Sequence, residues 1–229
     1  MRGAVVAIDG PAGAGKSTAA RRLAHRLGYV LIDTGALYRA VALVAKERGI
    51  DWDDAEALGQ LARTIELRFS PAPSEGGRPP LLVDGADRSD AIRAPDISEG
   101  ASRVSAHPPV RAALLGVQRA MGAQGGCVLE GRDIGTVVFP DADVKVFLTA
   151  SLDARADRRF EELVDAGAEV DRDSVMVEMA RRDARDAGRD TAPLRPAADA
   201  VPLDTTALDL DGVVERLVEI VREAGFSAR

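Results

Sequence analysis

The sequence predicts an α/β protein built on a parallel sheet, and two observations carry this prediction. Short apolar, β-branched runs of the kind that form buried strands alternate with stretches whose apolar residues recur at helical spacing. A glycine-rich turn at residues 10–15 joins the first apolar run to the first helical stretch. Such alternation places helices on both faces of a parallel sheet. We expect five strands, at residues 4–8, 29–32, 127–129, 144–148 and 200–203.

Two helices are expected beside the first two strands. The first follows the glycine-rich turn, and its apolar residues from Ala20 to Leu27 recur at helical spacing. Gly28 is placed to end it, because glycine readily takes the left-handed conformation that closes a helix. The second helix is expected over residues 36–49, with Gly49 at its end.

Residues 64–93 interrupt this alternation. The segment holds "TIELRFS", a Pro/Gly/Ser-rich turn and "LLVDGADRS", in which Asp84 and Gly85 form a hairpin signal. It predicts a small antiparallel sheet inserted into the α/β core. Residues 151–190 are helical in pattern and rich in arginine, which taken alone is typical of a solvated helix face.

Composition excludes several classes of function. The 229 residues carry a formal net charge of −7, which argues against broad binding to nucleic acid or to anionic membranes. No run approaches the ~18 apolar residues of a membrane span, and the N-terminal residues lack the length and cleavage site of a secretory signal. Cys127 is the single cysteine, so no intrachain disulfide can form. We therefore expect a cytoplasmic protein.

The glycine-rich turn has the pattern of a phosphate-binding loop, G-x-x-x-x-G-K-[ST], in Gly10, Gly15, Lys16 and Ser17. Backbone N–H groups of such a loop surround a β-phosphate, and the helix that follows adds its positive N-terminal end. Lys16 would bridge the β- and γ-phosphates, and Ser17 would hold Mg²⁺. The expected donor-binding residues are Gly10, Pro11, Ala12, Gly13, Ala14, Gly15, Lys16, Ser17 and Thr18.

Two further strand ends carry charged side chains. "DTGALYR" at 33–39 places Arg39 on the helix after the second strand, although taken alone it also fits an ordinary turn capped by Thr34. "EGRDIGTVVFPDA" places Glu130 at the end of the third strand, followed by Arg132 and Asp133. Ligands bind at the carboxyl ends of strands in open α/β sheets, so these side chains are expected to meet beside the phosphate-binding loop. GTPases, motors and kinases all share that loop, and the chain contains no N-K-x-D motif for guanine.

Four stretches resemble the bacterial cytidylate (CMP/dCMP) kinases, in order and over nearly the whole chain: "IDGPAGAGKST", "LIDTGALYRAVAL", "EGRDIGTVVFPDADVKVFL" and "RRDARDAGRDTAPLRPAADAVPLDTT". The resemblance implies a P-loop kinase whose parallel five-stranded sheet is flanked by helices, with an inserted NMP-binding domain and a short helical lid. It implies ATP, CMP or dCMP, and Mg²⁺ as ligands, no nucleic-acid or membrane partner, and a monomer. The implied division is a core of residues 1–35, 105–150 and 191–229, an insertion of 36–104 and a lid of 151–190.

The resemblance also implies roles for individual residues. Arg39, Arg132 and Arg189 match the arginines that hold the acceptor phosphate, and Thr34 matches a small hydroxyl residue beside it. Ser102, Arg111 and Asp133 match the residues that recognise cytosine, and Arg182 and Asp186 those that bind the sugar. Arg155, Arg158 and Arg159 match arginines of the lid helix. The expected catalytic residues are Lys16, Arg132, Arg158 and Arg189, and the expected metal site is Ser17 with Glu130 acting through water. Glu130 stands where many members of that family have aspartate.

The chemistry expected of this set needs no general base. A phosphate monoester has a second pKa of about 6, so the acceptor is mostly a dianion at neutral pH. Catalysis then depends on positioning two polyanions and stabilising the charge on the transferred group. Two alternatives stay open: a kinase of UMP, AMP or shikimate, and a nucleotide-dependent switch without transferase activity. Asp133 also has an alternative role, in which it pairs with Arg132 or caps the next turn.

Overall fold

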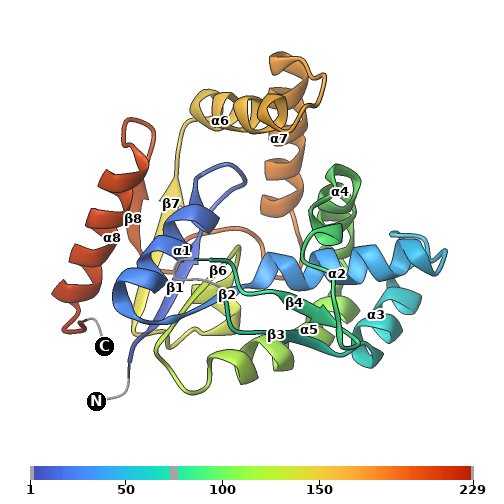
Figure 1. The fold of residues 1–229 in the computed structure, drawn as a ribbon, viewed down its shortest axis with the longest axis horizontal. Helices are drawn as coiled ribbons and strands as arrows, with labels where there is room; N and C mark the ends of the chain where they lie inside the picture. The colour runs from blue at the N-terminus through green and yellow to red at the C-terminus, as the bar shows by residue number, and fades with distance from the viewer. Residues whose placement is uncertain (1–2, 73–76, 228–229) are drawn as a thin grey trace.

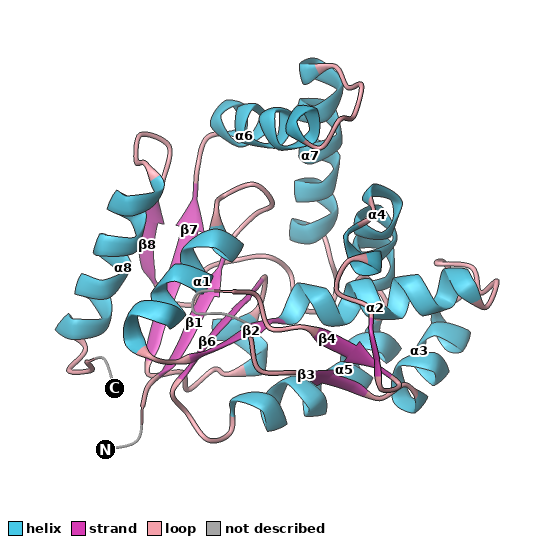
Figure 2. Ribbon diagram, viewed as in Figure 1, coloured by secondary structure: helices cyan, strands magenta, loops and turns pink. Residues whose placement is uncertain are grey.

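The computed structural model describes residues 3–72 and 77–227. Its centre is a parallel sheet of five strands in the order β2-β6-β1-β7-β8 (Figures 1 and 2). The predicted fold class is therefore confirmed, and each strand lies within a few residues of its expected place. The strands are β1 (Val5–Asp9), β2 (Val30–Asp33), β6 (Cys127–Gly131), β7 (Val144–Thr149) and β8 (Val201–Asp204).

Both faces of this sheet are covered, which explains why its strands are apolar at nearly every position. On one face, Val6 and Ile8 of β1 join a core with α1 (Lys16–Leu27) and α8 (Leu210–Glu223). On the other face, Val5 and Ala7 pack with residues of α5 (Pro108–Gly122) and of the turn 134–138.

The segment between β2 and α5 holds the predicted antiparallel sheet. Its strands are β3 (Leu67–Phe69), β4 (Leu81–Val83) and β5 (Ala86–Asp87), paired in the order β3-β4-β5. Asp84 and Gly85 both have positive φ, 50° and 81°, as the predicted hairpin turn requires. Helices α2 (Thr34–Glu47), α3 (Ala55–Thr64) and α4 (Pro95–Val104) form a second core with this sheet and α5, and a short 3₁₀ turn spans Ala91–Arg93.

Residues 151–190 form two helices, α6 (Leu152–Asp165) and α7 (Arg172–Ala187), as their pattern predicts. They pack on each other through a small apolar cluster of Ala156, Val175 and Met179. In Figure 1 the pair lies beyond the carboxyl end of β7, next to α4. The division of the chain into core, insertion and lid stays a prediction. Among the described residues, no helix is long and apolar enough to cross a membrane.

The boundary between β2 and α2 differs from the expected one. The helix begins at Thr34 rather than at residue 36, because Asp33 caps it by accepting a hydrogen bond from the backbone N–H of Ala36 at 3.0 Å. The alternative in which Thr34 is the cap is wrong. The Thr34 hydroxyl instead donates to the carbonyl oxygen of Glu130 at 2.7 Å and so joins β2 to β6.

Candidate active site

The phosphate-binding loop follows β1 directly and leads into α1. Gly10 has a φ of 149°, and a Cβ there would lie 2.0 Å from the carbonyl oxygen of Leu148, so no other residue fits. Lys16 opens α1 with its side chain buried, and its Nζ donates to the carbonyl oxygen of Pro11 at 2.6 Å. Burial, with the nearby Arg132, lowers the pKa of Lys16 well below its ordinary value. The ammonium is thus held over the loop, where it is poorly solvated and suited to binding an anion.

Ser17 and Glu130 meet at the edge of this loop. The Ser17 hydroxyl donates to Oε2 of Glu130 at 2.8 Å. Burial and the neighbouring Asp33 raise the pKa of Glu130 to about 7, although Lys16 acts in the opposite direction. A hydroxyl and a carboxylate beside a phosphate-binding loop are oxygen donors of the kind that Mg²⁺ prefers, and Mg²⁺ usually takes few protein ligands. The two predicted metal-site residues therefore lie together, and their chemistry fits Mg²⁺.

Arg39 lies in the second turn of α2, and its charge is balanced by Asp33 at the end of β2. The two side chains form an ion pair of 2.6 Å, and Asp33 uses its other oxygen to cap α2. Burial alone would raise the pKa of Asp33, but Arg39 and the cap hold it below its ordinary value. Arg39 is thereby fixed in direction while its Nε has no hydrogen-bond partner.

Of the three residues expected to recognise cytosine, Arg111 and Asp133 bind each other, and Ser102 is connected to Arg111 through Ser105. Arg111 and Asp133 form a buried ion pair, and Arg111 also lies 5.5 Å from the centre of the Tyr38 ring. Ser102 is buried, and its hydroxyl has no hydrogen-bond partner. The alternative in which Asp133 pairs with Arg132 is wrong, because the Asp133 carboxylate binds Arg111.

Arg132 and Arg189 are joined by Asp186. This carboxylate is 1% exposed and accepts from Nε of Arg132 at 2.8 Å with one oxygen, and from Arg189 with the other. Burial alone would raise the pKa of Asp186, but the surrounding arginines hold it below its ordinary value. Arg182 lies in the same group, and burial with the neighbouring Arg132 lowers its pKa to about 10. The Asp186 carboxylate thus holds the positively charged side chains of Arg132 and Arg189 close to each other.

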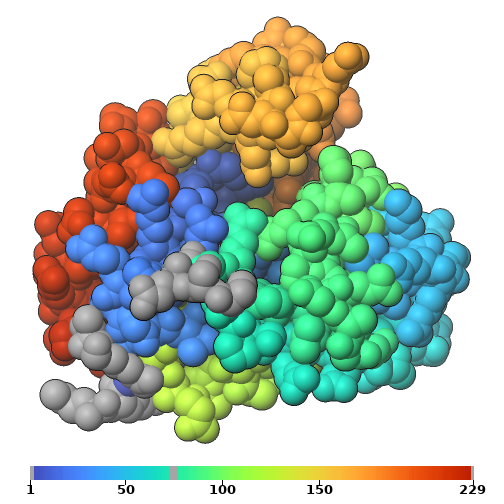
Figure 3. All heavy atoms as spheres, viewed as in Figure 1, coloured from blue at the N-terminus to red at the C-terminus, as the bar shows by residue number. Residues whose placement is uncertain are grey.

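The three predicted lid arginines pair with other groups than Asp186. Arg155 donates to the carbonyl oxygen of Ala12 in the loop at 3.1 Å and pairs with Asp183. Arg158 donates to the Thr205 hydroxyl at 3.1 Å, on the β8 side of the loop. Arg159 pairs with Glu162 at the surface. In Figure 3 the residues of α6 and α7 overhang a hollow that has N-terminal residues, drawn in blue, at its floor.

The comparisons with known proteins agree with this geometry. A family model described as cytidylate kinase matches residues 6–223. The chain belongs to the cytidylate kinase family. Cytidylate kinases from Syntrophotalea carbinolica and Geobacter sulfurreducens are 53% and 51% identical to it, over 96% and 97% of this chain and 92% and 94% of the relatives. The resemblance found in the sequence is thereby confirmed.

One solved structure adds evidence on the fold alone. A crystal structure of an uncharacterized protein from Eubacterium ventriosum superposes with a TM-score of 0.52 and covers 96% of this chain and 98% of its own. At 13% identity it says nothing about activity. The cytidylate kinase family is thus established by sequence, and the layered α/β architecture by the structure itself.

Sequence reasoning missed Asp9, which holds the turn after β6 in this member of the cytidylate kinase family. Asp9 is the last residue of β1, and its two carboxylate oxygens accept from the backbone N–H groups of Ile134 and Gly135, both at 2.8 Å. Burial raises the pKa of Asp9 to about 6, against the effect of these two hydrogen bonds. The turn that carries Arg132 and Asp133 is therefore fixed to the strand that carries the phosphate-binding loop. The sequence signal that could have identified Asp9 is its place directly before Gly10, but the phosphate-binding pattern begins at Gly10 and does not include it.

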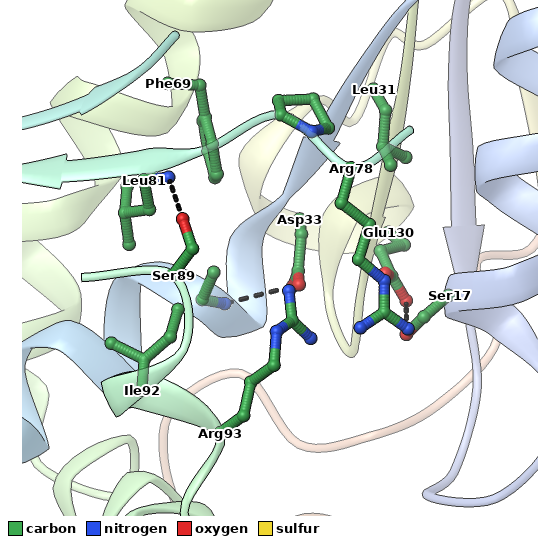
Figure 4. Close-up of a pocket in the computed structure, with 12 residues that line it drawn as sticks. Ser17, Leu31, Asp33, Phe69, Arg78, Leu81, Ser89, Ile92, Arg93 and Glu130 are labelled. Carbon is green, nitrogen blue, oxygen red and sulfur yellow. Dashed lines mark hydrogen bonds between the residues drawn. The ribbon is translucent and has the colours of Figure 1, made fainter. Parts of the chain in front are cut away.

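Sequence reasoning also missed Arg78 and Arg93. Figure 4 shows a pocket in which both side chains point toward Asp33, Ser17 and Glu130. Burial, with the neighbouring Arg78 and Arg39, lowers the pKa of Arg93. Neither residue belongs to a motif, and in a chain with many arginines no pattern distinguishes them. Arg78 and Arg93 thus add positive charge beside Ser17 and Glu130.

Proposed function

We propose that this protein transfers the γ-phosphoryl group of ATP to CMP and dCMP, with Mg²⁺. One observation carries the proposal beyond family membership. Among the described residues, six buried side-chain polar atoms have no hydrogen-bond partner, and four of them belong to the expected acceptor-binding residues. Buried polar groups are otherwise nearly always paired, so unpaired ones point to a missing ligand. These four atoms are Nε of Arg39, Oγ of Ser102, Nε of Arg182 and Nε of Arg189.

The donor side is assigned to the loop. Its backbone N–H groups and the N-terminus of α1 bind the β-phosphate, and Lys16 exchanges its contact with Pro11 for the β- and γ-phosphate oxygens. Ser17 and Glu130 would hold Mg²⁺, Glu130 through a bound water. The ion supplies positive charge to the phosphate oxygens of ATP. The glutamate side chain is long enough to stay hydrogen-bonded to Ser17, so the change from aspartate leaves the site intact.

The acceptor side is assigned to the arginines. Arg39, Arg132 and Arg189 bind the acceptor phosphate, whose oxygen attacks the γ-phosphorus directly because it is already ionised. Arg182 and Asp186 bind the sugar. No side chain has to take a proton in this step, in keeping with the lack of a histidine in any motif.

Cytosine is assigned to Ser102, Arg111 and Asp133. The base offers an amine donor at N4 and acceptors at N3 and O2, whereas uracil offers an acceptor at position 4 and a donor at N3. A carboxylate can only accept and a guanidinium can only donate. Asp133 opposite N4 and Arg111 opposite N3 and O2 therefore suit cytosine, and uracil would place like groups against like at both positions.

The remaining expectations are proposals of the same kind. Arg158, as a catalytic lid arginine, would have to leave Thr205 for the donor phosphates when both substrates are bound. A cytoplasmic location fits the single cysteine, and a monomer is the state expected from the family resemblance.

A coupled assay of ADP release over eight nucleoside monophosphates, four ribo and four deoxy, tests the proposed function. CMP and dCMP are expected to support turnover at least tens of times better than UMP, since each good polar pair contributes roughly 1–3 kcal/mol of discrimination. Slow ATP hydrolysis that no monophosphate accelerates would identify a switch instead. Equal turnover with UMP or AMP would identify a kinase of another acceptor.

A further inference from the structure

Ser105 lies between the side chains assigned to cytosine and those assigned to the acceptor phosphate. It directly follows α4 and is buried. Its backbone N–H donates to the carbonyl oxygen of Ala101 at 2.9 Å. Its hydroxyl donates to the backbone carbonyl oxygen of Ser102 at 3.1 Å. The end of α4 therefore fixes both the backbone and the side chain of Ser105.

Two arginines from distant parts of the chain bind Ser105. Arg111 of α5 donates from Nη1 to the Ser105 carbonyl oxygen at 3.2 Å. Arg189, just after α7, donates from Nη2 to the Ser105 hydroxyl at 2.9 Å. Arg111 also pairs with Asp133, and Arg189 also pairs with Asp186. The two buried ion pairs of the acceptor site thus meet at one residue.

The Ser105 hydroxyl fixes Arg189 to a part of the chain distant in sequence from α7. In the described part of the chain, the hydrogen bonds of Arg189 go to Asp186 and to Ser105. Asp186 lies three residues away at the end of α7, so it moves with Arg189. Ser105 belongs to the other side of the site, where α4 and α7 lie side by side (Figure 1). Without its hydroxyl, the guanidinium could turn about the Asp186 carboxylate.

We propose that Ser105 is a positioning residue for phosphoryl transfer: its hydroxyl sets the place of Arg189 relative to Arg111 and Asp133. The inference rests on the proposed function, in which Arg189 binds the acceptor phosphate and Arg111 binds cytosine. The role assigned to Ser105 passes through Arg189 rather than through a contact with substrate. Its carbonyl oxygen accepts from Arg111, and its hydroxyl both accepts from Arg189 and donates to the carbonyl oxygen of Ser102. Removal of the hydroxyl therefore frees Arg189, while the contact that holds Arg111 remains.

The test compares Ser105→Ala with Ser98→Ala, a half-buried serine within α4. In the described part of the chain, the hydrogen bonds of Arg111 and Arg189 do not include the Ser98 hydroxyl. Ser105→Ala is expected to lower kcat about tenfold, the effect of losing one hydrogen bond to a charged group. The KM for CMP should change less than threefold and the CMP/UMP preference should stay as in the unsubstituted enzyme, because the carbonyl oxygen still holds Arg111. Ser98→Ala should match the unsubstituted enzyme in kcat, in the KM for CMP and in the CMP/UMP preference. Unchanged kcat in Ser105→Ala, or a loss of CMP/UMP preference, overturns the proposal.

A second comparison separates positioning from a general effect on the fold. In an Arg189→Ala background, Ser105→Ala is expected to have no further effect on kcat, since its action passes through Arg189. An additional tenfold loss would mean that Ser105 acts elsewhere. If Ser105→Ala does not fold, Ser105→Cys preserves the side-chain size with a weakly bonding thiol and should lower kcat in the same way. If the unsubstituted enzyme fails to phosphorylate CMP, the proposed function is wrong; if it succeeds and both Ser105 variants match it, only the role of Ser105 is wrong.

Discussion

The ionised carboxylate of Glu130 is expected to destabilise the substrate-free protein at neutral pH and above. Replacing Glu130 by glutamine should reveal this effect. The side chain is 5% exposed, and burial together with Asp33 raises its pKa from an ordinary 4.5 to about 7. A carboxyl group with a raised pKa binds its proton more tightly in the folded than in the unfolded protein. The contribution of Glu130 to stability is therefore greatest below pH 4.5 and falls as the pH rises toward 7.

The size of the effect follows from this shift. A rise of the pKa from 4.5 to about 7 corresponds to roughly 3 kcal/mol at full ionisation, since a tenfold change in proton affinity is worth about 1.4 kcal/mol. Glu130→Gln removes the ionisation but keeps an oxygen to accept from the Ser17 hydroxyl. The variant should therefore be more stable than the original protein, and this difference in the free energy of unfolding should be about 2–3 kcal/mol larger at pH 8 than at pH 5. Activity should fall, because the variant lacks the charge assigned to the metal site.

Urea unfolding at the two pH values, without nucleotide or Mg²⁺, measures the difference. Asp186→Asn is the matched comparison, because this carboxylate is equally buried but its pKa is held low by the surrounding arginines. Its stabilising effect is present above pH 3.8 and is lost only as the pH falls further, so the variant should lose roughly 3 kcal/mol at both pH 5 and pH 8. The reasoning is refuted if the effect of Glu130→Gln is also the same at pH 5 and pH 8.

Three further predictions concern the donor loop, the base and the lid. Lys16→Ala should lower turnover by several powers of ten while the unfolding transition stays cooperative; near-normal turnover would remove Lys16 from the donor site. Asp133→Asn should lower kcat/KM for CMP and narrow the CMP/UMP ratio, because an amide can present either a donor or an acceptor to position 4; an unchanged ratio would mean that Asp133 does not recognise the base. Hydrogen exchange of residues 151–190 should slow when a bisubstrate analogue fills both sites, and exchange indifferent to the analogue would count against a mobile lid.

The elements of the fold were predictable where local chemistry decides them. Parallel strands buried on both faces have to be apolar throughout, so β1 and β7 were evident from the sequence. The Asp84-Gly85 turn was evident because both residues must take positive φ. The start of α2 was misplaced, since Thr34 and Asp33 are both good capping residues and only the contact of Thr34 with Glu130 decides between them.

The sequence shows which residues belong to the candidate site, but it does not show which of them bind one another. The motifs named Arg132, Asp133 and Asp186, yet nothing local shows that Asp133 binds Arg111, 22 positions away, or that Asp186 joins Arg132 to Arg189. Such contacts depend on which strand ends and helices meet in space. For the same reason Asp9 escaped notice, because its partners are backbone N–H groups on the neighbouring strand's turn.

The charges of the site favour the binding of phosphate groups, as the proposed function requires. Seven cations lie around the loop and the expected acceptor side, and three carboxylates lie among them: Lys16, Arg39, Arg78, Arg93, Arg132, Arg182 and Arg189 with Asp33, Glu130 and Asp186. Positive charges therefore outnumber negative ones in this group even when Glu130 is ionised, and a phosphate monoester dianion would balance part of that excess. Burial makes this excess costly in the free protein, as the lowered pKa values of Lys16 and Arg182 indicate. An acceptor phosphate relieves that cost on binding, so the repulsion among the cations favours the complex over the empty site.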